Sequence, residues 1–181
     1  ATQAAAAADV SAAQADADRA RIAAETAQQS ERRAQDEKIV MRNQLSQQLN
    51  AILQTRDSER GLVVSMSDLL FDSGKFSLKP GTREKLAKIA GILIAHPGLA
   101  IEVGGYTDNV GGAEMNQRLS ENRAGAVRDY MVAQGVHTDS VSAKGFGNSS
   151  PVASNDAAMG RQENRRVELV VSGEAIGVRP L

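Results

Sequence analysis

The first 60 residues contain neither glycine nor proline, so all 16 glycines and all 4 prolines of the chain lie from Gly61 onward. Alanine, glutamine, glutamate and arginine, which are good helix formers, dominate this segment. With no turn signal inside it, residues 1–60 are predicted to form one long helix, or two helices with a soft break, spanning roughly 90 Å if unbroken. We therefore expect a helical spacer at 1–60, a domain at 61–173 and a tail at 174–181.

Alanines recur at seven-residue spacing along this predicted helix, and the spacing leaves two interpretations open. The repeat comprises Ala6, Ala13, Ala20, Ala27, Ala34 and Met41. An alanine seam permits close helix packing but buries little apolar area, so it associates weakly. The segment is either a solvated spacer or a self-associating coiled coil or helical hairpin.

Residues 61–173 alternate between strand-like and helix-like patterns. The β-branched and alternating stretches that predict strands are 61–71, 99–106, 141–147 and 165–172, and the patterns that predict helices are 78–98 and 113–134. The order is β-α-β-α-β-β, which predicts an α/β two-layer sandwich with both helices on one face. Strands joined by a helix are expected to be parallel. The last two strands are expected to pair in the same sheet.

Composition excludes several classes of protein. The net charge is −1 and aromatic residues make up only 3% of the chain, so neither a basic stripe nor base stacking supports nucleic-acid binding. The absence of cysteine rules out disulfides and cysteine-based metal sites. No cofactor motif is present. No membrane tether, signal peptide or lipidation cysteine is visible in the sequence, and no apolar run reaches membrane-spanning length.

The stretch GGYTDNVGG, residues 104–112, stands between a predicted strand and a predicted helix. Asp108 thus lies at the carboxyl end of a strand, which is where ligands bind in α/β folds. The amides that open the following helix add a place for an anionic group. Gly111 and Gly112 allow the chain to turn sharply between the two elements.

Arg123 lies on or beside the apolar stripe of that helix, four residues after Leu119 and four before Val127. A charged side chain among core positions needs a partner, and Asp108 is the nearest candidate along the chain. One interpretation is an Asp108–Arg123 ion pair that only holds the turn to the helix. The other is a clamp for a zwitterion, in which Arg123 takes a carboxylate in bidentate fashion and Asp108 takes an ammonium.

Catalytic signatures are missing. No GxSxG, HExxH or P-loop occurs, and the two histidines, His96 and His137, are isolated at a predicted helix end and a turn. The sequence therefore favours a protein that binds rather than one that catalyses a reaction.

The stretches YTDNVGGAEMNQRLSENRAGAVRDYM, GFGNSSPVASND and GRQENRRVELVV, with FDSGKFSLKPGTREKLAKIAGIL upstream, resemble the OmpA-like peptidoglycan-binding domain over residues 61–173. The resemblance implies a periplasmic protein on the cell-wall side of the outer membrane. It also implies non-catalytic binding of the diaminopimelate-containing peptide stem of peptidoglycan, which anchors the envelope. The alternative is a helical scaffold in which the pairing of Asp108 with Arg123 is structural.

The resemblance also implies roles for individual residues. The aspartate of the T-D motif, Asp108, would bind the ligand ammonium, and the arginine of L-S-x-x-R-A, Arg123, its carboxylate. The supporting pocket implied by the family comprises Phe71, Asp72, Thr107, Asn116, Leu119 and Arg165. The chain departs from the family at Tyr106, where histidine usually precedes T-D.

Overall fold

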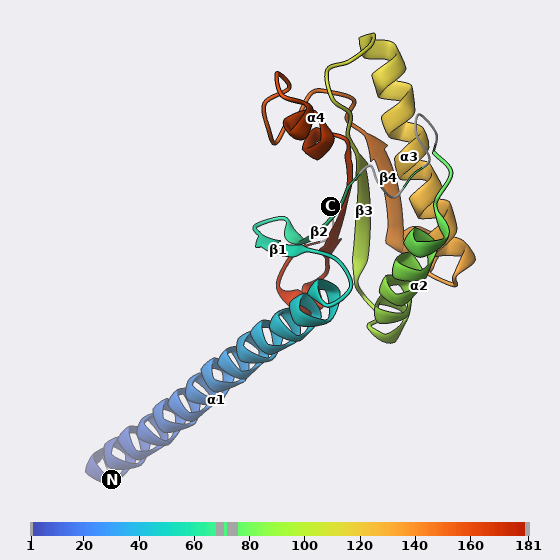
Figure 1. The fold of residues 1–181 in the computed structure, drawn as a ribbon. Helices are drawn as coiled ribbons and strands as arrows, with labels where there is room; N and C mark the ends of the chain where they lie inside the picture. Colours follow the sequence, from blue (N-terminus) through green and yellow to red (C-terminus); the bar gives the residue numbers. More distant parts are fainter. Residues whose placement is uncertain (1, 68–70, 72–75, 180–181) are drawn as a thin grey trace. The chain divides into compact units, whose positions relative to one another are not determined.

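The computed structural model of the protein describes residues 2–67, 71 and 76–179, with side chains from residue 11 onward. The chain forms two compact units, Ala1–Ile39 and Val40–Leu181. Helix α1 (Thr2–Asn50) is a single helix that contains all the described residues of the first unit and begins the second (Figure 1). The prediction of a long N-terminal helix is therefore confirmed.

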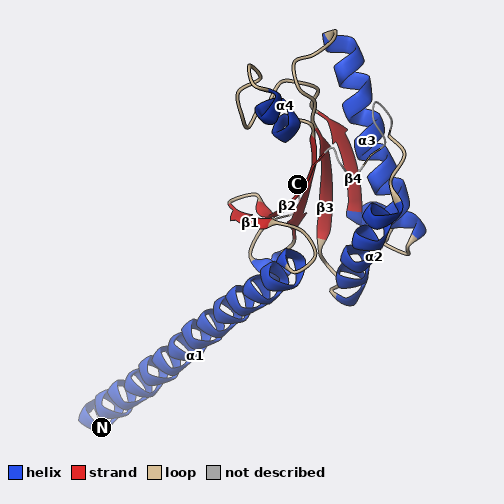
Figure 2. Ribbon diagram, viewed as in Figure 1, coloured by secondary structure: helices blue, strands red, loops and turns tan. Residues whose placement is uncertain are grey.

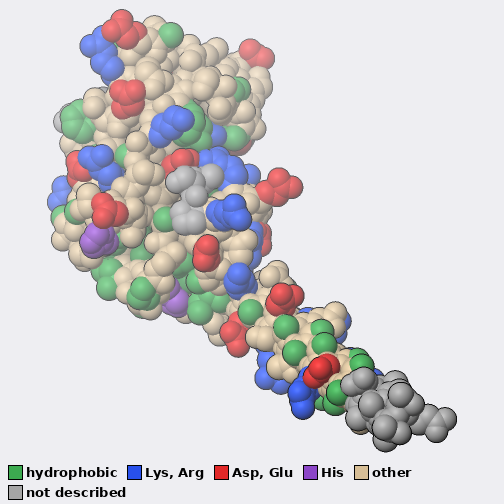
Figure 3. All heavy atoms as spheres, turned by 180° about the vertical axis from the view of Figure 1, so that it is seen from behind, with side chains coloured by type: hydrophobic (Ala, Val, Ile, Leu, Met, Phe, Trp, Pro, Cys, Tyr) green, Lys and Arg blue, Asp and Glu red, His purple; other side chains and the backbone are tan. Residues whose placement is uncertain are grey.

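The two portions of α1 differ in burial. Every side chain from residue 11 to residue 37 is exposed, and Figure 3 shows acidic, basic and apolar side chains interspersed along the helix. In the second unit, by contrast, Leu45 and Leu49 are each 1% exposed and belong to the hydrophobic core. The last turns of the helix thus pack as part of the folded domain.

Five strands form one sheet in the order β1-β2-β5-β3-β4. Their bounds are β1 (Thr55–Ser58), β2 (Gly61–Ser67), β3 (Ala100–Gly105), β4 (Val141–Gly145) and β5 (Arg166–Ser172). Strands β3 and β4, joined by a helix, are parallel, as predicted. The last two strands share the sheet but are not neighbours, because β5 inserts antiparallel between β2 and β3.

Helices α2 (Pro80–Ala95) and α3 (Ala113–Ala133) lie on one face of the sheet, which confirms the two-layer sandwich (Figure 2). Val167, Leu169 and Val171 alternate along β5 into the core between sheet and helices. Arg166 and Glu168 occupy the intervening positions of the same strand, and Arg166 Nε donates a 2.9 Å hydrogen bond to Glu168 Oε1.

Four features differ from what the sequence predicted. Strand β1 and helix α4 (Ala158–Asn164) are short elements, and apolar residues do not recur regularly in either segment. The tail folds back through a bridge between Gly173 and Val178, which leaves Ile176 1% exposed. The strand predicted at 61–71 is observed as β2 over Gly61–Ser67, and residues 68–70 lie outside the described residues.

No described helix combines the length and the apolarity that crossing a membrane requires.

Candidate ligand-binding site

Asp108 lies just beyond the carboxyl end of β3 and is 7% exposed. Two backbone hydrogen bonds fix the segment before it: Tyr106 N donates to Arg166 O at 2.9 Å, and Thr107 N donates to Gly147 O at 2.8 Å. Gly111 follows with φ of +92°, a conformation that favours glycine, so the chain turns into α3 without strain. The predicted strand-to-helix turn is present.

Both carboxylate oxygens of Asp108 have partners. Arg165 Nη1 lies 2.7 Å from Oδ2 in an ion pair, and Val110 N donates to Oδ1 at 3.0 Å. Among the ion pairs of the described residues, Asp108 pairs with Arg165; none joins it to Arg123. The aspartate is thus oriented by a residue that directly precedes β5.

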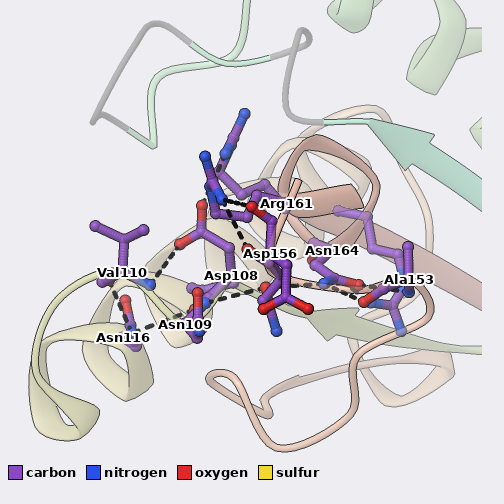
Figure 4. A network of polar contacts seen from close by, with 12 residues as sticks. Asp108, Asn109, Val110, Asn116, Ala153, Asp156, Arg161 and Asn164 are labelled. Atoms are coloured by element: carbon purple, nitrogen blue, oxygen red, sulfur yellow. Dashed lines mark hydrogen bonds and ion pairs between the residues drawn. The ribbon is translucent and has the colours of Figure 1, made fainter. Parts of the chain in front are cut away.

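Asn116 ties the turn to the first turns of α3 (Figure 4). Its Nδ2 donates to Val110 O at 3.1 Å and to Asp108 O at 3.4 Å, and its side chain is buried. Thr107 Oγ1 also donates to Asp108 O, at 3.0 Å. The two residues that the family resemblance placed around Asp108 therefore hold the backbone of its turn.

Arg123 is 2% exposed, and its guanidinium carbon lies 5.2 Å from the centroid of the Phe71 ring. This is the geometry of a cation–π contact, which suits arginine's flat, weakly hydrated guanidinium. Leu119, one turn earlier on α3, is half-buried. The prediction that Asp72 belongs to this pocket falls outside the described residues.

Asn164 is a completely buried residue whose role sequence reasoning did not identify. Its Oδ1 accepts from Val152 N at 2.8 Å and from Ala153 N at 3.0 Å, and its Nδ2 donates to Asn155 Oδ1 at 2.9 Å. Asn155 Oδ1 also accepts from Asn109 N, at 3.3 Å. Asn164 thereby connects the loop before α4 to the Asp108 turn. The sequence feature that could have identified Asn164 is its position directly before the two arginines of the N-R-R-V motif.

Tyr106 packs away from this polar network. Its ring stacks on Phe146 with centroids 5.0 Å apart, and the guanidinium of Arg166 lies 3.9 Å from its centroid. Burial, followed by the negative charge of Glu168, raises the pKa of Tyr106 above its ordinary value of 10.0. The tyrosine that stands where the family usually has histidine therefore serves packing in this chain.

The described side chains include no cluster of three or more histidine, aspartate or glutamate residues that would suit a metal ion. What the site offers is an oriented carboxylate and a buried guanidinium, carried by neighbouring segments. A carboxylate accepts up to four hydrogen bonds and a guanidinium donates five. Groups of opposite charge in one region suit a ligand that carries both an ammonium and a carboxylate.

Residues 70–165 match the OmpA family over about half of the chain. The chain belongs to the OmpA family. Among curated members, the probable lipoprotein YiaD of Escherichia coli is 37% identical over 65% of this chain and 54% of its own length. The peptidoglycan-binding protein ArfA of Mycobacterium bovis is 41% identical over 60% of this chain and 33% of its own. The chain thus spans about half the length of YiaD and about a third of the length of ArfA.

Solved structures share the fold of this chain. The cell wall anchor of the type VI secretion system (T6SS) from Pseudomonas aeruginosa superposes with a TM-score of 0.56 at 33% identity. The match covers 62% of this chain and 81% of that one. The family resemblance drawn from the sequence motifs is therefore confirmed, and the fold agrees with it.

Proposed function

We propose that residues 61–173 bind the diaminopimelate-containing peptide stem of peptidoglycan without cleaving it, and so anchor the outer membrane to the cell wall. Asp108 pairs with the ammonium at one end of diaminopimelate, and Arg123 takes the carboxylate of the same end. The protein acts in the periplasm, on the cell-wall side of the outer membrane.

The observation that carries this proposal is that a member of the OmpA family presents a fixed carboxylate, Asp108, at the turn before α3 and a buried arginine, Arg123, on α3 itself. Arg165 and Val110 hold Asp108 in one orientation, so ligand binding does not have to order it. Arg123 also contacts the Phe71 ring, with its guanidinium carbon 5.2 Å from the ring centroid. Two relatives, the peptidoglycan-binding protein ArfA and the cell wall anchor of the T6SS, support binding to the wall.

The test is co-sedimentation with purified sacculi. Arg123→Ala leaves the ligand carboxylate without its bidentate partner, and removing one member of a desolvated charge pair costs about 2–5 kcal/mol, so binding should fall more than tenfold. Asp108→Asn keeps the shape of the turn but removes the charge that faces the ammonium, and should also weaken binding. Arg128→Ala and Asp139→Asn alter residues of the same types, whose side chains are 43% and 89% exposed, and should bind like wild type.

Four outcomes separate the candidate functions. Loss of binding by Asp108→Asn with an unchanged circular dichroism spectrum and melting temperature supports the clamp. A lower melting temperature with intact binding assigns Asp108 a structural role. If wild type does not bind sacculi at all, the helical scaffold becomes the better account; release of soluble fragments would indicate an enzyme.

The charge pattern also predicts specificity. A stem with lysine in place of diaminopimelate lacks the extra carboxylate that Arg123 would hold, so it should bind more weakly. Competition between the two free stem peptides, measured by calorimetry, gives the ratio directly. Equal affinity would contradict the role assigned to Arg123.

A further inference from the structure

A shallow cavity of about 290 Å³ lies on the surface beside α3, and its apolar walls are conspicuously exposed. Phe76 is 51% exposed and Met115 is 58% exposed, whereas Leu119 is half-buried. Exposed aromatic and methionine side chains that share one hollow indicate a contact surface.

This cavity adjoins the proposed clamp along α3. Leu119 precedes Arg123 by one turn of the helix, a rise of about 5.4 Å. On the other wall, Phe76 comes two residues before Leu78, which forms a β-bridge with Phe71, the ring beneath Arg123. The clamp holds the side-chain end of diaminopimelate, so three methylene groups and one peptide bond place the next residue of the stem up to about 9 Å from the clamp, which is far enough to reach the cavity.

Two polar side chains complete the lining, Arg118 and Asn122. Arg118 Nη2 lies 2.6 Å from Glu114 Oε1, but both side chains are about 70% exposed or more. An exposed pair of this kind contributes little to stability, so a ligand carboxylate can compete for the guanidinium. The cavity therefore combines an apolar surface with a cation and an amide donor.

We propose that this cavity binds a terminal alanine of the peptide stem, the residue that follows diaminopimelate. This inference rests on the proposed function of the clamp. The alanine methyl packs against Phe76, Met115 and Leu119. Its free carboxylate pairs with Arg118 and accepts a hydrogen bond from Asn122. The domain thereby distinguishes stems of four residues that end in alanine from stems of three residues that end in diaminopimelate.

Calorimetric titration with the two synthetic stems tests the proposal. Burial of one methyl group alone is worth roughly a factor of four in affinity, so the tetrapeptide should bind wild type at least about fourfold more tightly. The double variant Phe76→Ser/Met115→Ser and the single variant Arg118→Ala should each lose this advantage while binding the tripeptide as wild type does. The matched controls lie outside the cavity lining: Met159→Ser, at a residue that is 75% exposed, and Arg128→Ala, at a side chain that is 43% exposed, should keep the advantage.

The outcomes distinguish this inference from the function on which it rests. If wild type binds both stems equally, the inference is overturned while the clamp stands. If the variants weaken the tripeptide and the tetrapeptide by the same factor, the cavity does not recognise the terminal alanine and the inference fails. If neither stem binds wild type, the clamp itself is wrong and the inference falls with it. Circular dichroism of each variant verifies that these exposed substitutions leave the fold intact.

Discussion

At the scale of single residues, the charges of the site are arranged by segments far apart in the sequence. Asp108 is oriented by Arg165, which is 57 positions away, and by its own turn through Val110. Arg123 rests on Phe71, which precedes α2. Spacing along α3 was enough to single out Arg123 as a buried charge, but the guanidinium that contacts Asp108 comes from the residue before β5.

A substitution at Gly105 tests how tightly α3 packs on β3. A Cβ at this position would lie 2.1 Å from Ser120 O, which is backbone of α3 and cannot give way cheaply. Gly105→Ala should therefore lower the free energy of unfolding by about 1–3 kcal/mol, the usual cost of overpacking. Gly125→Ala is the control, because nothing lies within 4 Å of its Cβ and alanine favours a helix; it should raise stability by roughly 0.5–1 kcal/mol. Urea unfolding measures both, and equal effects would contradict the packing.

Tyr106 should make stability depend on alkaline pH. Its pKa is raised in the folded state, so the unfolded chain ionises this phenol more readily as pH increases. The stability that Tyr106 contributes is fully present below pH 10 and is lost as pH rises through the folded-state pKa. In urea titrations between about pH 8 and pH 11, Tyr106→Phe should show a shallower decline than wild type and than the control Tyr130→Phe. Identical declines would refute the prediction.

At the scale of elements, the end of α1 is bound to the sheet by both apolar and polar contacts. Leu45 and Leu49 enter the core, and Arg42 Nη2 donates to Ser58 O at 2.7 Å while Nη1 donates to Ile176 O at 3.3 Å. Arg42 also pairs with Asp57 of β1, and its hydrogen bond holds the pKa of that carboxyl below the ordinary value of 3.8. A boundary near Gly61 would separate these residues from the core that they complete.

Truncation tests where the folded unit begins. A chain that starts at Val40 should melt at the temperature of the full chain, since residues 11–37 are exposed. A chain that starts at Thr55 should still melt cooperatively but at least about 5 °C lower, because each buried leucine contributes roughly 1.5–3 kcal/mol.

Two double variants of the chain from Val40 test whether the buried leucines account for the difference in melting temperature between the two truncated chains. Leu45→Ala/Leu49→Ala should melt near the temperature of the shorter chain, and the exposed pair Gln47→Ala/Gln48→Ala should not. If the chain from Thr55 melts as high as the chain from Val40, the last turns of α1 do not belong to the stable core.

At the scale of the whole molecule, we expect the first unit to be a solvated spacer that does not self-associate. Its described side chains are mostly small or charged, and the ion pairs Asp16–Arg19 and Asp18–Arg21 are exposed pairs within one helix that contribute little. We predict a monomer in sedimentation velocity for both the full chain and the chain from Val40, even at high protein concentration. A dimer that disappears when residues 1–39 are removed would instead establish the alanine repeat as an interface.

The sequence by itself determined the long helix, the two packed helices of the domain, most of its strands and the family. It also drew attention to Asp108 and Arg123, because a polar turn after an apolar strand and a charge on an apolar stripe are local patterns. Tertiary structure decided the central place of β5, the pairing of Asp108 with Arg165 and the packing of Tyr106 between Phe146 and Arg166. Periodicity reports which face of an element is apolar, whereas the partner of a strand or a charge depends on which distant segments the folded chain brings together.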